Sequence, residues 1–214
     1  MAYIGSKPAN KPVVASDLDP TVITGQTALA TSPASTDEFL ISDAGVLKRL
    51  DASLIGGGKI GQVVTTTKTD IWSQSTSGNT FYQPTGFSRT ITPTATSSKI
   101  LIMACCSWSA TTNYEIGTKI TRTVGGSEVD ILIGDAAGSR TRTFLSERSN
   151  AAADYAAITM ILLDSPNTTS EITYKPVAAT ESSATLYLNK HHSDNDQASE
   201  FRAASSIVCM EVLA

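Results

Sequence analysis

The chain has 214 residues, a net charge of −4 and a pI near 5.1, and 41% of its residues are hydrophobic. This hydrophobic fraction is enough for a folded core, which excludes general disorder. The acidic balance offers no basic field for nucleic acid or for an anionic membrane surface. No apolar run approaches the roughly 18 residues of a membrane span, and the first residues do not form a secretory signal. We therefore expect no nucleic-acid partner and no membrane insertion.

Residues 1–36 are rich in Ser, Thr and Ala, and prolines at positions 8, 12, 20 and 33 interrupt every candidate helix. Such a segment is either an unstructured terminus or a peg that orders on docking to a partner. A predicted hairpin follows at 37–50, with turn residues Asp43-Ala44-Gly45 between two apolar stretches. A lone hairpin is marginal in water, so it should pack against copies of itself or another protein.

The glycines at 56–58 predict a hinge, which divides the chain into a segment 1–55 and a domain 59–214. Only 17% of residues are charged, and turn residues recur throughout the domain. This pattern is typical of an all-β, antiparallel β-sandwich of jelly-roll type. An Ala-rich opening leaves a helix at 150–163 as an alternative. The strands that we expect are 60–67, 81–84, 87–93, 100–108, 116–124, 129–133, 153–164, 172–177, 185–188 and 207–213.

The predicted strand 100–108 is apolar on both faces, because Ile100, Ile102 and Trp108 alternate with Leu101 and Met103. A strand of this kind must be covered on both sides. We expect it to be central, with its second face covered by a neighbouring subunit.

The three cysteines are an odd number without metal-ligand spacing. Cys105 and Cys106 are adjacent and so point to opposite faces of the strand, which makes a shared zinc ion implausible. Buried free thiols in a reducing compartment are the expectation. No metal and no cofactor is assigned.

Several stretches resemble short tail-fibre and accessory virion proteins of marine and cyanobacterial tailed phages. These are the Ala-Tyr-Ile-Gly start at 2–5, the hairpin at 37–49, Ile91-Thr92-Pro93 with 97–102, Gly134 to Arg140, and Leu163 to Thr169. The resemblance implies a homotrimeric virion fibre or spike, assembled in the host cytoplasm, with an N-terminal anchor and a β-rich head. The anchor would contact other virion proteins through Tyr3, Ile4, Pro8, Pro12, Phe39, Leu40, Ile41 and Leu47.

The densest cluster of potential ligands lies at 191–196, where a loop is expected between two strands. His191, His192, Asp194 and Asp196 could form a receptor-contacting tip or, near a trimer axis, hold an ion. The same residues also suit a solvated hairpin loop.

Arg140 and Arg142 could bind a carboxylate or phosphate of a host-surface polysaccharide, or could pair with Glu147 or Asp135. Trp72, expected in a loop, is the best candidate for stacking on a sugar ring, although aromatic residues are more often found in a core or interface.

The sequence offers little for catalysis. The glycine run at 56–61 lacks the spacing of a phosphate-binding loop, and there is no Gly-x-Ser-x-Gly motif. Asp154, Asp164 and Glu181 could supply paired carboxylates, but nothing in the sequence pairs them. We expect no enzyme.

The function predicted is a fibre or spike that recognises a host surface, and the alternative is a capsid-decorating or tail-accessory protein that contacts only virion proteins.

Overall fold

The computed structural model describes residues 27, 33–34, 36–44, 46–55, 59–148 and 155–213. The chain divides into two units, Met1–Gly57 and Gly58–Ala214. The predicted glycine hinge at 56–58 and the Ala-rich start of the alternative helix lie outside the described residues. The described ranges contain no helix with the length and hydropathy needed to cross a membrane.

The first unit contains the predicted hairpin. Strands β1 (Glu38–Asp43) and β2 (Val46–Asp51) pair in an antiparallel register that runs from Glu38 opposite Asp51 to Asp43 opposite Val46. Ala44 has a φ of 50°, the left-handed conformation that a two-residue hairpin turn requires. A 3₁₀ turn, Ala52–Leu54, follows. The hairpin prediction is confirmed.

The second unit, which we call the head, is built from short strands joined by polar loops. Its strands are β3 (Ile60–Lys68), β4 (Trp72–Ser75), β5 (Arg89–Ile91), β6 (Lys99–Ala110), β7 (Glu115–Val124), β8 (Ser127–Ile131), β9 (Leu145–Arg148), β10 (Ala156–Asp164), β11 (Ile172–Thr180), β12 (Thr185–Leu188) and β13 (Ser205–Val212).

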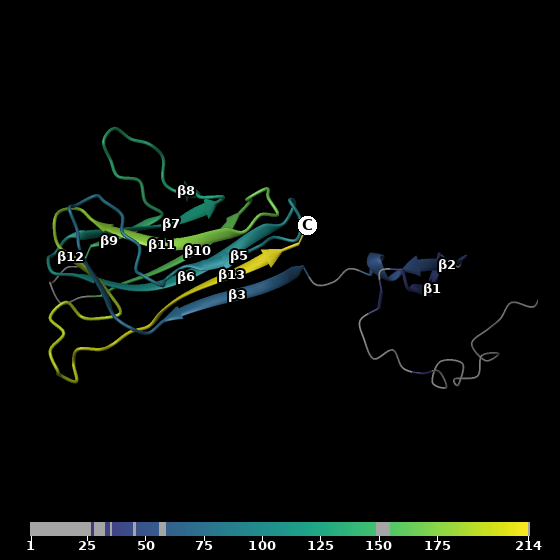
Figure 1. The fold of residues 1–214 in the computed structure, drawn as a ribbon, viewed down its shortest axis with the longest axis horizontal. Coiled ribbons are helices and arrows are strands. Elements are labelled where there is room, and N and C mark those ends of the chain that lie inside the picture. The colour runs from purple at the N-terminus through teal and green to yellow at the C-terminus, as the bar shows by residue number, and fades with distance from the viewer. Residues whose placement is uncertain are drawn as a thin grey trace, which may run out of the picture. The chain divides into compact units, whose positions relative to one another are not determined.

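These strands form two antiparallel sheets that pack as a sandwich (Figure 1). The six-stranded sheet has the order β3-β13-β6-β12-β4, with β10 on the other side of β6. The five-stranded sheet has the order β5-β11-β7-β8, with β9 also on β7. The sandwich prediction is confirmed. The strand expected at 81–84 is wrong, because only Tyr82 forms an isolated bridge there, and β4 and β9 were not predicted.

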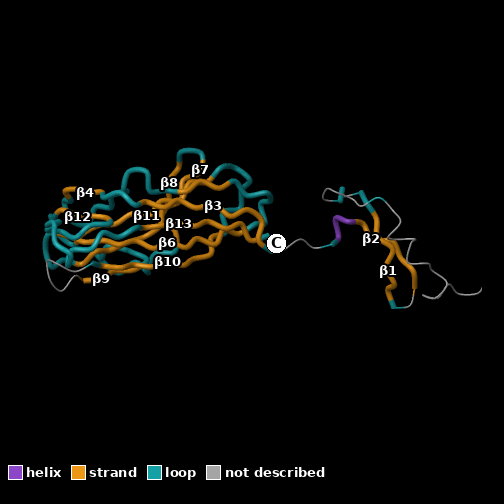
Figure 2. Tube along the Cα trace, turned by 90° about the horizontal axis from the view of Figure 1, so that it is seen from below, coloured by secondary structure: helices purple, strands orange, loops and turns teal. Residues whose placement is uncertain are grey.

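The six-stranded sheet is four strands wide, because β12 and β13 lie end to end along the same side of β6. Leu188 pairs with Trp108, and Ser206 pairs with Cys105. Strand β4 pairs with β12 and β3 pairs with β13, so these two strands share one outer edge. Strand β10 forms the opposite edge (Figure 2). The central position predicted for strand 100–108 is therefore confirmed.

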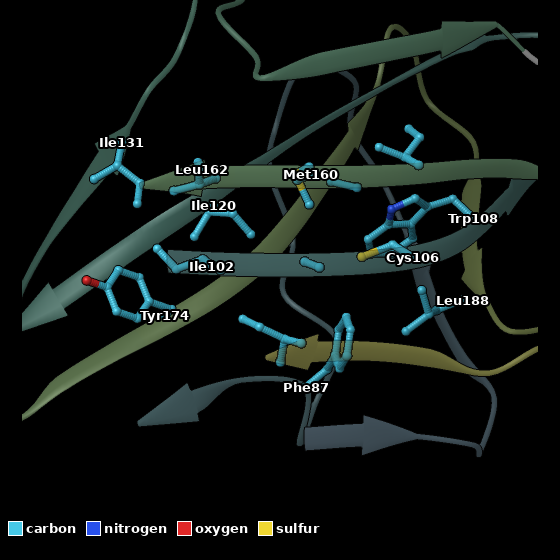
Figure 3. Packing of buried hydrophobic residues seen from close by; sticks show 14 of the residues in the cluster. Phe87, Ile102, Cys106, Trp108, Ile120, Ile131, Met160, Leu162, Tyr174 and Leu188 are labelled. Carbon is cyan, nitrogen blue, oxygen red and sulfur yellow. The ribbon is translucent and has the colours of Figure 1, made fainter. Parts of the chain in front are cut away.

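The core lies between the two sheets, and β6 contributes its Ile100, Ile102, Cys106 and Trp108 side chains (Figure 3). The second strongly apolar run is strand β10, so the helical alternative is wrong for Ala156–Asp164. Alternation explains the result: every second residue of β10 is buried, which a helix does not produce. The C-terminal strand β13 lies between β3 and β6, as predicted for an apolar terminus.

Asp164, at the end of β10, connects the two sheets. Its carboxylate accepts hydrogen bonds from Arg122 at 2.8 and 2.9 Å and from the Tyr174 hydroxyl at 2.7 Å. Burial, together with the neighbouring carboxylate, raises the pKa of Tyr174 above its usual value. Asp164 is thus engaged in a structural network, and it is not one of a pair of carboxylates in a cleft.

Glu211 on β13 is a second buried carboxylate, and it fixes the loop that precedes β6. It accepts hydrogen bonds from the Thr94 backbone N–H at 2.6 Å, the Thr94 hydroxyl at 2.7 Å and the Gln62 amide at 3.0 Å. Burial by itself raises the pKa, but these hydrogen bonds outweigh it and hold the pKa of Glu211 at about 2. The charged form is therefore the one that stabilises the fold.

Replacing Glu211 by Gln should lower the free energy of unfolding at pH 7 by about 1–3 kcal/mol, because hydrogen bonds to a charged acceptor are lost. A lowered pKa in the folded state contributes stability above the unfolded pKa and loses it as pH falls towards 2. The difference between wild type and E211Q should therefore shrink as pH falls from about 5 to 2. Urea unfolding at several pH values measures this difference in the free energy of unfolding. A difference that does not change with pH would contradict the lowered pKa of Glu211.

Candidate functional site: the outer face of the six-stranded sheet and its bordering loop

The outer face of the six-stranded sheet carries apolar side chains in rows across four strands. In one row, Leu163 of β10 lies opposite Leu101 of β6, which lies opposite Met210 of β13, which lies opposite Val63 of β3. The neighbouring row consists of Ile161, Met103, Val208 and Thr65 in the same strand order. We call these eight residues the outer apolar patch.

The patch is uncovered in the single chain. Ile161 is 60% exposed, Val63 is 54% exposed and Leu163 is 45% exposed, while Leu101 and Met103 are half-buried. A third row of Thr159, Cys105, Ser206 and Thr67 continues the surface without a charge. A one-faced antiparallel sheet normally exposes polar residues on its solvent side. Contiguous exposed apolar surface of this kind marks a site of interaction.

Cys105 corrects the prediction of buried thiols. It is exposed on the outer face, whereas Cys106 and Cys209 are buried in the core, and all three are free. Burial raises the pKa of the Cys209 thiol to about 12, and it also raises the pKa of Cys106. Cys105 and Cys106 do point to opposite faces, as the sequence predicted.

The predicted loop is the segment 189–204, which interrupts one line of strand between β12 and β13. Asn189 fixes its base. The side chain is fully buried and donates hydrogen bonds to the backbone carbonyls of Lys68 at 2.7 Å and Asp70 at 3.1 Å. Its amide oxygen accepts from the Ser205 hydroxyl at 2.6 Å. With a φ of 64°, Asn189 adopts the left-handed conformation that Asn tolerates better than most residues.

The loop folds over the outer face at one end of the sheet. Ser109 belongs to the outer face by alternation, yet it is buried, and its hydroxyl donates to the Lys190 carbonyl at 2.7 Å. The Tyr155 hydroxyl, next to the start of β10, donates to the Phe201 carbonyl. The loop therefore reaches from β12 across β6 to β10. It closes this end of the outer face and leaves the outer apolar patch open beside it.

A polar network organises the loop internally. Ser193 contacts His191 Nδ1 at 2.6 Å and donates to Glu200 at 2.8 Å, and the Asn195 side chain also donates to Glu200 at 2.9 Å. Burial opposes the charge on Glu200, but these hydrogen bonds prevail and hold the pKa of Glu200 below its usual value. These contacts cross-link the loop between His191 and Glu200.

The charged side chains of the loop are also engaged. Asp194 is held by Lys190 at 3.3 Å and by Arg202. The ring of His192 lies 4.6 Å from that of His191, centroid to centroid, and burial followed by the neighbouring His191 lowers the pKa of His192. Asp196 is exposed. Within the described residues, no group of three or more His, Cys, Asp and Glu side chains is arranged to hold a metal ion.

Trp72 lies in a strand, so the loop predicted for it is wrong. It begins β4 and is half-buried, and its ring meets that of Trp108 edge to face with a centroid distance of 6.4 Å and an interplanar angle of 75°. Trp108 belongs to the core, and Trp72 is partly buried against it. The sequence missed this because β4 has only four residues, of which Trp72 alone is strongly apolar.

Arg140 and Arg142 lie in the exposed loop between β8 and β9. Neither forms the expected pair with Glu147 or Asp135. Arg140 donates to the Ala137 carbonyl at 3.3 Å, and Arg142 donates to the Gly134 carbonyl at 2.6 Å. Both guanidinium groups thus stabilise their own loop, far along the chain from the His191 cluster.

Half of the residues predicted to attach the chain to other virion proteins lie in the described part of the chain. Tyr3, Ile4, Pro8 and Pro12 lie outside the described residues. Phe39, Leu40 and Ile41 lie on β1, where Leu40 is 75% exposed, and Leu47 lies on β2.

Comparisons with known proteins give no family assignment. No family model matches the chain, and no curated protein matches it. Among solved structures, the VP2 subviral particle of infectious bursal disease virus matches at 14% identity and a TM-score of 0.35, covering 84% of this chain and 43% of that one. The Gx strain of the same virus matches at 14% identity and a TM-score of 0.39, covering 80% and 40%. The chain thus spans less than half the length of either protein. TM-scores this low do not establish a shared fold, so neither match bears on function.

Replacing Asn189 by Ala should destabilise the head by about 2–3 kcal/mol, because buried partners lose their hydrogen bonds and the left-handed backbone is strained. It should also speed tryptic cleavage after Lys190 and Arg202. N189G relieves the backbone strain but also lacks the side-chain hydrogen bonds. It should therefore be more stable than N189A and less stable than wild type. Thermal unfolding and limited proteolysis measure both effects. An N189A protein as stable and as resistant as wild type would show that the loop is held elsewhere.

Proposed function

We propose that this chain is a virion structural subunit, a tail fibre or spike. Residues 1–55 attach it to other virion proteins, and the head assembles as a homotrimer that presents its loops to a host surface. The observation that carries the proposal is the outer apolar patch, because exposed apolar surface of this extent suits a subunit contact. The motif resemblance at 2–5, 37–49 and in the head supplies the phage context.

The energetics favour assembly through this face. Fully burying one aliphatic side chain contributes about 1.5–3 kcal/mol, so completing the burial of half-exposed ones contributes about 1 kcal/mol each. Seven aliphatic side chains per subunit lie in the outer apolar patch. Their combined burial contributes about 7 kcal/mol per subunit, which offsets part of the roughly 4–15 kcal/mol that association costs in translational and rotational freedom. The outer apolar patch itself holds no charged side chain, and Lys99 of β6 borders it.

The patch and the loop suit different roles within one head. The loop 189–204 closes one end of the outer face and lies away from the first residues of β3, where the head begins (Figure 1). We infer that this end of the head is the one that meets the host surface. His191, His192, Asp194 and Asp196 would then form part of a tip whose weak contacts act together, since multivalency raises avidity without new contacts. The role is non-enzymatic.

The second candidate is a decoration or tail-accessory protein that contacts only virion proteins. It is favoured by the internal engagement of the receptor candidates: Trp72 packs on Trp108, and Arg140 and Arg142 bind their own loop. Under this function the outer apolar patch is covered by a different virion protein.

Light scattering of the full chain should give three subunits per particle. Met103→Lys places a charge within the outer apolar patch and should dissociate the trimer. Leu163→Lys, at an already exposed position, should do the same with less strain on the fold. The matched control is Val129→Lys, at an exposed position of β8 in the other sheet, which should remain trimeric. A monomeric wild type would overturn the trimer and favour the second candidate.

The native thiol at position 105 gives an independent measurement. If the patch is buried between subunits, maleimide should label Cys105 slowly in wild type and rapidly in Leu163→Lys. Cys106 and Cys209, buried in the core, should be labelled only on unfolding in both proteins. Equal rates of Cys105 labelling in wild type and variant would contradict a covered patch.

Host-surface recognition is tested with the trimer on an array of bacterial surface polysaccharides. Loss of binding when His191, His192 and Asp194 are replaced by Ala would support the proposal that the loop contacts the host surface. Binding that is unchanged by these replacements, or absent from the whole array, favours the decoration protein.

A further inference from the structure

Two edges of the six-stranded sheet are unprotected. In the described part of the chain, β10 pairs only with β6, and β3 pairs only with β13, so each leaves one backbone edge without a partner. Exposed strand edges pair readily with other chains, and proteins usually guard them with charges, prolines, bulges or short length. Strand β10 has nine residues, no proline or glycine, and one charge, Asp164, which is bound to Arg122.

Strand β3 is open from Val63 onwards, whereas its first residues contain Gly61 and a register shift against β13 between Ile60 and Val63. It also has nine residues, and its one charged residue is Lys68 at the last position, where the ammonium group pairs with Asp70 at 2.7 Å. The run Val63 to Thr67 is entirely β-branched, which favours strand pairing.

The edges of the other sheet are guarded. Strand β5 has three residues. Strand β8 carries Glu128 and Asp130, and β9 has four residues that include Glu147 and Arg148. By contrast, β3 and β10 each carry one charged residue, at the last position, and each of these charges is paired within the chain.

The two open edges match each other. Strand β6 is antiparallel to β10 and to β13, and β13 is antiparallel to β3. Strands β10 and β3 therefore run in opposite directions. A second copy placed beside the first in the same orientation brings its β3 against β10 of the first copy as an antiparallel pair. The rows of the outer apolar patch then continue from one subunit into the next.

We infer that β10 of each subunit pairs with β3 of a second copy of this chain. Three six-stranded sheets then join edge to edge around a three-fold axis that runs along the strands, and their outer apolar patches face that axis. This inference rests on the proposed function, because it assigns the contact that holds the trimer. A contact between two different edges is heterologous, and such contacts close into rings when the rotation permits. Pairing of β10 with β10, in contrast, produces a two-fold dimer.

The test is disulfide trapping in the full chain with Cys105→Ser as background. Thr65→Cys on β3 is combined with Ile161→Cys on β10, because both positions belong to one row and the continued row places them opposite each other. Thr159→Cys and Leu163→Cys replace Ile161→Cys to sample registers shifted by one pair in each direction. After mild oxidation, at least one combination should give a ladder of dimer and trimer on a non-reducing gel.

The single variants are the matched controls, and each should stay monomeric on the gel. A dimer from Ile161→Cys alone would show pairing of β10 with itself and would overturn the inference, as would a ladder that continues beyond the trimer. A trimer by light scattering that no combination cross-links would also overturn the edge pairing, yet would leave the trimer of the proposed function standing. A monomer by light scattering would remove both.

Discussion

The apolar character of both faces of β6 is the constraint on which this structure depends. Its inner face, with Ile100, Ile102 and Trp108, packs against the five-stranded sheet and forms the centre of the core. Its outer face, with Leu101 and Met103, has no second layer within the described residues. Because β10, β13 and β3 extend the same apolar rows, the exposed apolar surface belongs to the whole sheet, and the proposed function covers it with other subunits.

Two buried carboxylates link strands of the six-stranded sheet to the rest of the head. Asp164 joins β10 to Arg122 and Tyr174 of the opposite sheet, and Glu211 joins β13 to the loop before β6. Both carboxylates are buried and fully hydrogen-bonded, which is the condition under which a buried charge stabilises a fold. They link β10 and β13 to the rest of the head, while the outer apolar patch itself carries no charged residue.

The loop 189–204 interrupts one line of strand without displacing the strands on either side of it. Asn189 and Ser205 close its base, so β12 and β13 continue along β6 as if uninterrupted. The residues between them cross the outer face and form a polar surface at one end of the head. The outer apolar patch and the polar surface of the loop thus lie side by side on one sheet. Under the proposed function, the patch is the subunit contact and the loop is the recognition surface.

The sequence by itself determined the hairpin, the sandwich class, the central position of strand 100–108 and the insertion of the C-terminal strand, because these follow from apolar periodicity and turn residues within a few positions. Tertiary structure alone decided the rest. The outer apolar patch combines residues of four strands, and the pairing of β12 and β13 with one side of β6 joins segments about 80 to 110 residues from it. Trp72 and Asn189 acquired their roles from distant partners, Trp108 and Lys68, which no local pattern reveals. The local sequence pattern determines which side chains of a strand share a face. The pairing of strands distant in sequence determines which residues lie next to that face.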